Sequence, residues 1–107
     1  MITIDDFKKL EIKIGKVISA ERIPNADKLI KLILDMGGEQ RQVVAGIAEV
    51  IDDPARLIGC EMPVLVNLEP RRLRGYDSHG MILAANDGGR PVLLHPEKEV
   101  PPGSIVR

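Results

Sequence analysis

Segment 67–85, read as NLEPRRLRGYDSHGMILAA, holds the residues of this chain best suited to bind another molecule. Three arginines, Arg71, Arg72 and Arg74, fall within four positions of it. A guanidinium group can donate two parallel hydrogen bonds to a phosphate, so neighbouring arginines can hold successive phosphates. The whole chain of 107 residues has a formal charge of −1. A local cationic cluster on a neutral background predicts a defined polyanion site.

Catalysis and metal binding find no such support in the sequence. Ser78 and His79 are adjacent, and neighbours on a strand point to opposite faces of the sheet. A nucleophile also needs its base within hydrogen-bond reach and a third group that orients the base. Neither His79 nor His95 lies in a cluster of metal ligands. We therefore expect no catalytic residue, no metal and no cofactor.

The elements that must position the arginines are short strands. β-Branched segments recur between Gly and Pro, which predicts an all-β protein with an aliphatic core, since Phe7 and Tyr76 are the only aromatic residues. A slip in the alternation marks Gly15 as a candidate bulge. The five expected strands are residues 11–20, 29–36, 40–46, 62–68 and 80–85.

Two short helices are expected beside these strands. Ile4, Phe7 and Leu10 share one side of a helix over residues 4–10. A second helix begins at Asp53, which caps it, with Pro54 at its first position.

Five strands with a short helix between the third and the fourth follow the order of an OB-fold barrel. We expect one domain, residues 1–107, with a C-terminal extension. In this fold the loops between strands 1 and 2 and between strands 4 and 5 often contact ligands. The two polar loops, 24–28 and 69–79, occupy these positions.

Composition narrows the cellular setting. The single cysteine, Cys60, excludes an intrachain disulfide and a four-cysteine zinc site. The opening MITIDDFKKL lacks the pattern of a signal peptide, and no apolar run approaches about 18 residues. We expect a cytoplasmic protein without membrane contact.

Several blocks of the chain, taken in order, resemble one family. It is the tRNA-binding OB-fold module found at the C-terminus of many methionyl-tRNA synthetases. Similar modules occur in stand-alone structure-specific tRNA-binding proteins and in the endothelial monocyte-activating polypeptide family. The matching blocks are DFKKLEIKIGKV (6–17), PNADKL (24–29), VVAGIA (43–48), NLEPRRLRGYDSHGMILAA (67–85) and VPPGS (100–104).

The resemblance implies binding of tRNA by shape, without catalytic activity in this domain. It also implies a homodimer, built with the N- and C-terminal extensions, and association with a methionyl-tRNA synthetase catalytic region. The positions implied to contact tRNA are Asn25, Lys28, Arg41, Asn67, Arg71, Arg72, Arg74, Ser78 and Met81.

Plainer interpretations stay open for each motif. The arginines can be a solvated loop, and residues 24–28 can be only a turn. Ser78 either caps the loop or donates to phosphate or ribose, and Met81 either packs in the core or offers a nucleotide an apolar surface. Two other function classes also remain: a protein-binding chaperone or assembly domain of the same fold, and a nucleic-acid-binding enzyme.

Overall fold

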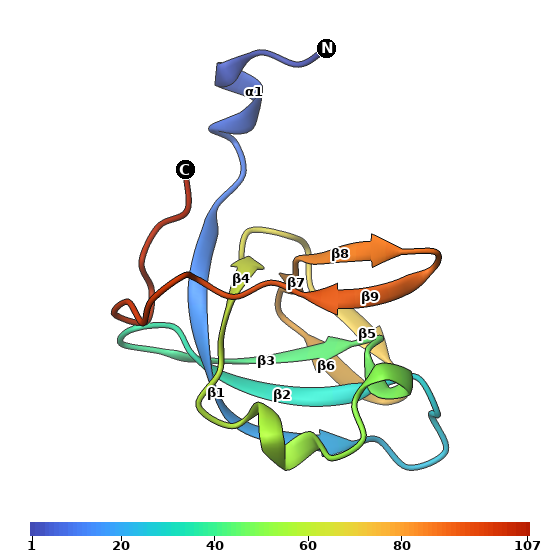
Figure 1. Cartoon of the computed structure of the whole chain (residues 1–107). Coiled ribbons are helices and arrows are strands. Elements are labelled where there is room, and N and C mark those ends of the chain that lie inside the picture. The colour runs from blue at the N-terminus through green and yellow to red at the C-terminus, as the bar shows by residue number, and fades with distance from the viewer.

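Alternating apolar residues build the sheet. On β2 (Ile30–Asp35), Ile30, Leu32 and Leu34 are fully buried, while the residues between them are half-buried. Because successive side chains of a strand point to opposite faces, this alternation lays one face of the sheet on a core. The computed structural model describes residues 1–107 and shows the sheet curled into a nearly closed antiparallel barrel (Figure 1).

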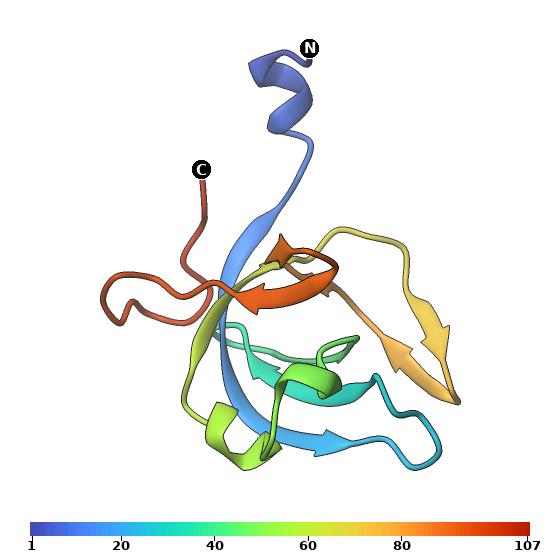
Figure 2. The same cartoon turned by 45° about the vertical axis from the view of Figure 1, so that its right-hand side comes forward.

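The main sheet has five strands in the order β3-β2-β1-β4-β7. The remaining strands form two separate hairpins (Figure 2). This confirms the predicted all-β barrel. The other strands of the main sheet are β1 (Ile12–Arg22), β3 (Gln40–Ala45), β4 (Glu61–Leu65) and β7 (Met81–Ile82). The hairpins are β5 (Arg71–Leu73) with β6 (Tyr76–Ser78), and β8 (Ala84–Asp87) with β9 (Arg90–Leu93). The helical elements are α1 (Ile4–Phe7), η1 (Ala48–Val50) and η2 (Pro54–Leu57).

Strand β1 joins both halves of the barrel, since it pairs with β4 in its first part and with β2 in its second. A Cβ atom at Gly15 would lie 2.7 Å from Sδ of Met36, so a larger residue at this close approach would force the Met36 side chain to move. The bulge predicted at Gly15 lies further along, because the register with β2 shifts between Val17 and Ser19. The sequence signal at Gly15 therefore reported tight packing and not an extra residue.

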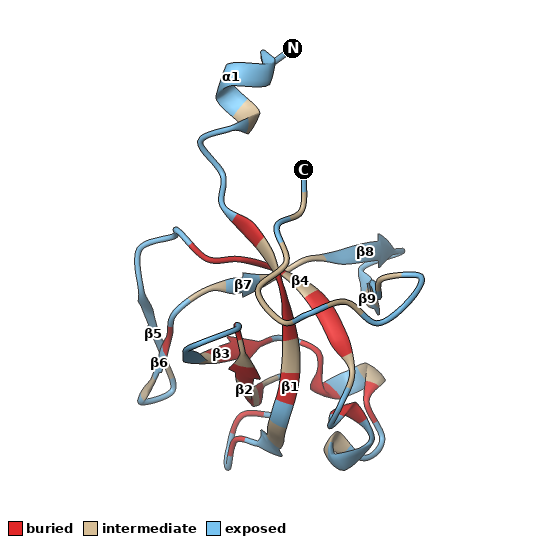
Figure 3. Ribbon diagram, turned by 90° about the vertical axis from the view of Figure 1, so that its left-hand side faces the viewer, coloured by how far each residue is buried: buried red, intermediate tan, exposed pale blue.

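Aliphatic side chains alone fill the barrel. The buried residues concentrate on β1 to β4, and the two hairpins and α1 are largely exposed (Figure 3). The largest fully buried side chains are Ile30, Leu32, Leu34, Ile51, Met62, Val17, Val43 and Val64.

The segment between β3 and β4 is helical, as expected, but it forms 3₁₀ turns. The Asp53 side chain accepts a hydrogen bond from the Ala55 N–H at 3.0 Å, and Pro54 occupies the first helical position. This confirms the predicted cap. Leu57, on the same turn, is buried in the main core.

Helix α1 ends at Phe7 and is shorter than predicted. The Thr3 side chain accepts from the Asp6 N–H, and the Asp6 carboxylate accepts from the Thr3 N–H. The hydrogen bond from the Thr3 N–H to the carboxylate, followed by that from the Thr3 side chain, lowers the pKa of Asp6 from its ordinary value. No residue of α1 is buried, and the helix stands away from the barrel (Figure 1). None of the helices has the length and apolar composition needed to cross a membrane.

The predicted fifth strand, 80–85, is divided between β7 and β8. Proline has no N–H to donate to a sheet. Pro63 of β4 therefore accepts from the Leu83 N–H at 3.0 Å but returns no bond. Regular pairing between β4 and β7 covers only two residue pairs, and the chain then leaves the barrel to form the β8–β9 hairpin.

The C-terminal segment returns to the first strand and covers its free edge. The Ile14 N–H donates to the Ser104 carbonyl at 2.8 Å, and the Val106 N–H donates to the Ile12 carbonyl at 2.8 Å. Both ends of the chain therefore lie at the same pole of the barrel (Figure 1).

Candidate nucleic-acid interface

The predicted basic loop, 69–79, is in fact a β-hairpin. Arg71 pairs with Ser78 and Leu73 pairs with Tyr76 across it. Its two-residue turn places Arg74 at φ 50° and Gly75 at φ 86°. Positive φ at both central positions is the geometry that best matches the twist of the flanking strands, and glycine adopts it freely. Gly75 was therefore a turn signal inside the charge cluster.

All three arginines are exposed on this hairpin. Arg72 forms an ion pair with Asp77 across the two strands, with 2.9 Å between Nη1 and Oδ1. An exposed ion pair of this kind contributes only about 0–1 kcal/mol, so a phosphate can compete for the guanidinium. Arg71 and Arg74 form no salt bridge. The hairpin therefore presents guanidinium groups that are available to an anion.

The hairpin meets the first polar loop, as the barrel topology predicted. Residues 25–29 and Arg74 line one open groove of about 380 Å³. The approach of the hairpin tip to this loop is visible at the lower right of Figure 2. We call the loop 24–29 together with the hairpin 71–78 the basic corner.

The first loop contributes Lys28 and Asn25 to the groove. The Lys28 side chain is 79% exposed and lies 3.8 Å from Glu49, a loose contact that leaves the ammonium group accessible. Asn25 has φ 61°, a left-handed conformation that asparagine tolerates better than most residues. The loop motif thus has a structural explanation at Asn25, whereas Lys28 has no structural partner other than Glu49.

Ser78 does not present its hydroxyl to the surface. Its residue exposure is 4%, and Oγ accepts from the Val44 N–H at 3.0 Å and donates to the Gly80 carbonyl at 3.1 Å. The predicted donation to phosphate or ribose is not supported by this geometry. Ser78 instead provides an acceptor for the Val44 N–H of β3, at the place where the barrel closes.

Asn67 is also engaged within the fold. Its side-chain oxygen accepts from the Glu11 N–H at 2.9 Å, and its Nδ2 donates to the Lys9 carbonyl at 2.7 Å. The amide thus joins the end of β4 to the start of β1. This geometry favours a structural role over the predicted tRNA contact.

Arg41 closes the barrel. Its Nη1 donates to the Val66 carbonyl at 2.6 Å and to the His79 carbonyl at 3.1 Å, and its Nε pairs with Glu39 at 3.0 Å. The side chain is 27% exposed. Most of its donors therefore serve the fold, and its predicted tRNA contact is not favoured.

Known proteins resemble this chain over its whole length. Residues 12–105 match the model of the family described as "Putative tRNA binding domain". The chain belongs to this tRNA-binding domain family. The methionine–tRNA ligase of Archaeoglobus fulgidus is 54% identical to it over 105 residues, which are 98% of this chain and 16% of that ligase. The tRNA-binding domain therefore spans about a sixth of the length of such a relative.

Solved structures agree on the fold. The crystal structure of a MetRS-related protein from Pyrococcus horikoshii superposes with a TM-score of 0.94 at 40% identity, covering 100% of this chain and 98% of that one. The chaperone CsaA from Bacillus anthracis gives a TM-score of 0.89 at 33% identity, covering 100% and 99%. The OB-fold barrel expected from the sequence is confirmed by these neighbours.

Met81 lies on β7 opposite Leu65 and is 43% exposed. It is therefore not ordinary core, and its side chain can offer an apolar surface. A contact between Met81 and a nucleotide stays a prediction.

Sequence reasoning missed three residues of the domain that support the basic corner. Gln42 of β3 accepts from the His79 N–H at 2.8 Å, and its Nε2 donates to the Asp77 carbonyl at 2.9 Å. Leu73 and Tyr76 pack beneath the hairpin. The signal for the last two was present, because they are the only apolar residues among the arginines.

Proposed function

We propose that this domain binds tRNA by the shape of its sugar-phosphate backbone and has no catalytic activity of its own. One observation carries the proposal: Lys28 and Arg74 line the same groove although 46 positions separate them in the chain. Arg71 and Arg72 extend the positive surface along the hairpin. A polyanion that lies along the hairpin can therefore contact both halves of this corner at once.

Charge and geometry favour the backbone over the bases as the target. Guanidinium and ammonium groups bind phosphate oxygens through charge-assisted hydrogen bonds. Proteins that hold single strands usually stack bases on aromatic side chains. The only aromatic residue of the corner is Tyr76, and it packs into the protein. Recognition through phosphates and riboses is therefore the expected mode.

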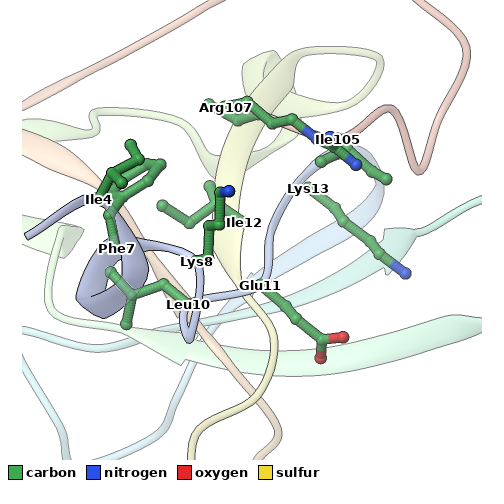
Figure 4. A pocket seen from close by; sticks show the side chains of 10 residues that line it. Ile4, Phe7, Lys8, Leu10, Glu11, Ile12, Lys13, Ile105 and Arg107 are labelled. Carbon is green, nitrogen blue, oxygen red and sulfur yellow. The ribbon is translucent and has the colours of Figure 1, made fainter.

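A second copy of the chain is the proposed partner at the opposite pole. A groove of about 500 Å³ lies between α1 and the C-terminal segment (Figure 4). Its apolar side chains include Ile4, Leu10 and Ile105, which are 67%, 44% and 59% exposed. Pairing of two copies through α1 would cover them, and a dimer would present two basic corners and raise avidity without new contacts. A monomeric sedimentation profile at micromolar concentration would refute this dimer.

The relatives indicate a context for the tRNA. Because the matching part of the Archaeoglobus ligase is 16% of that protein, we propose that this domain acts beside a methionyl-tRNA synthetase catalytic region. It would serve either within the same chain or in trans, by holding the tRNA near that region.

Protein binding is the second candidate, favoured by the 33% identity to the chaperone CsaA. A chaperone function predicts binding through apolar contacts and little change of affinity with salt. Phosphate binding predicts the opposite, because each phosphate contact releases counterions.

A titration with mixed tRNA separates these functions. We expect the domain to bind tRNA more tightly than an unstructured RNA of equal length, at both low and moderate salt. Equal affinity for the two RNAs would contradict recognition by shape. Absence of binding to either RNA would contradict the proposed function altogether.

A further inference from the structure

A second, smaller hydrophobic cluster lies outside the barrel. It is separate from the main core and sits beneath the basic corner. Its buried members are Ile23, Ala26 and Val44, and the half-buried residues packed against them are Leu29, Leu73 and Tyr76.

The cluster exists because the hairpin covers the outer face of β3. Val43 is fully buried in the main core, and the next residue, Val44, points to the opposite face. Val44 is nevertheless only 7% exposed, because it packs in the second cluster. Leu73 and Tyr76 form one residue pair across the hairpin, so both strands of the hairpin contribute to this contact.

Both halves of the basic corner share this cluster. The first loop contributes Ala26, two positions before Lys28, and Leu29, the residue directly after it. The hairpin contributes Leu73 and Tyr76, which lie on either side of its two-residue turn. The cluster is therefore a packed connection between the two cationic elements.

Little else holds the tip of the hairpin. Strands β5 and β6 form a separate two-stranded sheet. Hydrogen bonds between residues 77–79 and the β3 residues Gln42 and Val44 attach the base of the hairpin to β3. An isolated two-stranded hairpin is marginally stable in water. The position of Arg74 at the tip therefore depends on the apolar packing below it.

The Tyr76 ring also contacts a lysine. Nζ of Lys31 lies 5.4 Å from the ring centroid, within the range of a cation–π contact. Lys31 in turn lies 3.3 Å from Glu21 and is 23% exposed. A ring that carries the cluster and a lysine in this way is a support and not a free stacking platform.

We propose that Leu73 and Tyr76 are positioning residues, which hold Arg74 across the groove from Lys28 before tRNA arrives. The inference rests on the proposed function and adds that the hydrophobic cluster orders the hairpin before tRNA binds. A loosened hairpin would have to be ordered on binding, and that cost would appear as lost affinity. The bound state would keep its phosphate contacts, so the salt dependence of the affinity would not change.

The test compares three variants with one control. Leu73→Ala and Tyr76→Ala remove apolar support from either strand of the hairpin. Tyr76→Leu removes the aromatic ring but keeps much of the packing volume. Leu57→Ala is the control, because Leu57 is buried in the main core and not in the second cluster. We measure the affinity for tRNA at several salt concentrations, the thermal unfolding midpoint, and hydrogen exchange at the Val44 and His79 amides.

We expect Leu73→Ala and Tyr76→Ala each to weaken tRNA binding by about tenfold with an unchanged salt slope. Exchange at the two amides should become faster, and Tyr76→Leu should lose much less affinity. Leu57→Ala should lower the unfolding midpoint while the folded protein keeps its affinity.

Two results would overturn the inference. Unchanged affinity in Leu73→Ala and Tyr76→Ala would show that the cluster does not position the arginines. Equal losses in Tyr76→Ala and Tyr76→Leu, with none in Leu73→Ala, would show that the ring itself stacks on a base. If Tyr76→Ala does not fold, Leu73→Ala and Tyr76→Leu decide the question. Either result leaves tRNA binding by the wild type intact, so it is distinct from failure of the proposed function.

Discussion

The two poles of this barrel are built in opposite ways. At the basic corner, charged side chains stand on a hairpin that has its own apolar support. At the other pole, apolar side chains stand on α1, which has no buried residue. A site for a polyanion gains from a rigid support, since a hairpin that is already ordered loses little entropy on binding. An apolar helix without support gains from being covered, because covering removes its surface from water.

The largest expected effect concerns the arginines. Replacing Arg71, Arg72 and Arg74 together by alanine should weaken tRNA binding by about 100-fold or more, because three phosphate contacts are lost. The free energy of unfolding should change little, since all three side chains are exposed. Filter binding or anisotropy measures the first quantity, and urea denaturation measures the second.

A matched control carries the same loss of charge elsewhere. Lys9, Arg90 and Lys98 are exposed and lie outside the basic corner. Their triple alanine variant should bind tRNA within a few-fold of the wild type, apart from the general effect of net charge. Equal losses in the two triple variants would mean that binding follows net charge and not the corner.

Ser78 provides the next test, because its hydroxyl bonds within the fold and not to tRNA as the sequence predicted. Ser78→Ala would leave the buried Val44 N–H without its partner, which should destabilise the domain by about 1–3 kcal/mol. Thermal or urea unfolding measures this loss. A Ser78→Ala protein of unchanged stability and weakened tRNA binding would restore the direct contact that the sequence predicted.

Polar substitutions at the pole that carries α1 should change the oligomeric state. Replacing Ile4 and Leu10 by serine should give a monomer in sedimentation equilibrium and weaken tRNA binding by about tenfold through lost avidity. The substitutions should not lower the stability of a single barrel, because α1 has no buried residue within one copy. The thermal unfolding midpoint measures this stability. Dimers that persist in this variant would place the interface elsewhere.

A single substitution at the hairpin tip should separate stability from binding. Arg74 has a positive φ, which costs a non-glycine residue about 1–2 kcal/mol. Arg74→Gly should relieve much of this strain and stabilise the domain slightly, while the salt slope of tRNA binding falls by about one phosphate contact. Lower stability in Arg74→Gly would contradict this view of the turn.

Acidification should loosen the C-terminal segment. The ion pair with Lys16 lowers the pKa of Glu99 from its ordinary value of 4.5, and the same pair raises the pKa of Lys16. A lowered pKa means that Glu99 contributes fully above pH 4.5 and that its contribution is lost as the pH falls through the lowered value. Protection of the Gly103 and Val106 amides should therefore fall in acid, and Glu99→Gln should show less of this dependence.

Much of the fold was readable because the relevant signals are local. Period-two alternation placed the strands, and the Asp53-Pro54 pair placed the start of η2. The division of the fifth strand was not readable, since it depends on Pro63 in a neighbouring strand. The hairpin was mistaken for a loop because its charges hid a turn whose residues have positive φ.

The candidate site was likewise predictable from the sequence only in part. Arg74 was predicted from residue type and spacing and Lys28 from the family resemblance, and the structure brings both to one groove. Ser78, Asn67 and Arg41 were grouped with them because a polar residue in a binding motif looks alike whether it faces a ligand or the backbone. Only the partners across the barrel, such as Val44 and Val66, distinguish the two cases.

The salt dependence of tRNA binding tests the central claim most directly. We would measure the affinity of the wild type and of the Arg71, Arg72 and Arg74 triple alanine variant from low to moderate salt. A corner that grips phosphates predicts a steep negative slope for the wild type, and a slope shallower by about two to three for the variant. A wild-type slope near zero, or the same slope for both proteins, would contradict the account.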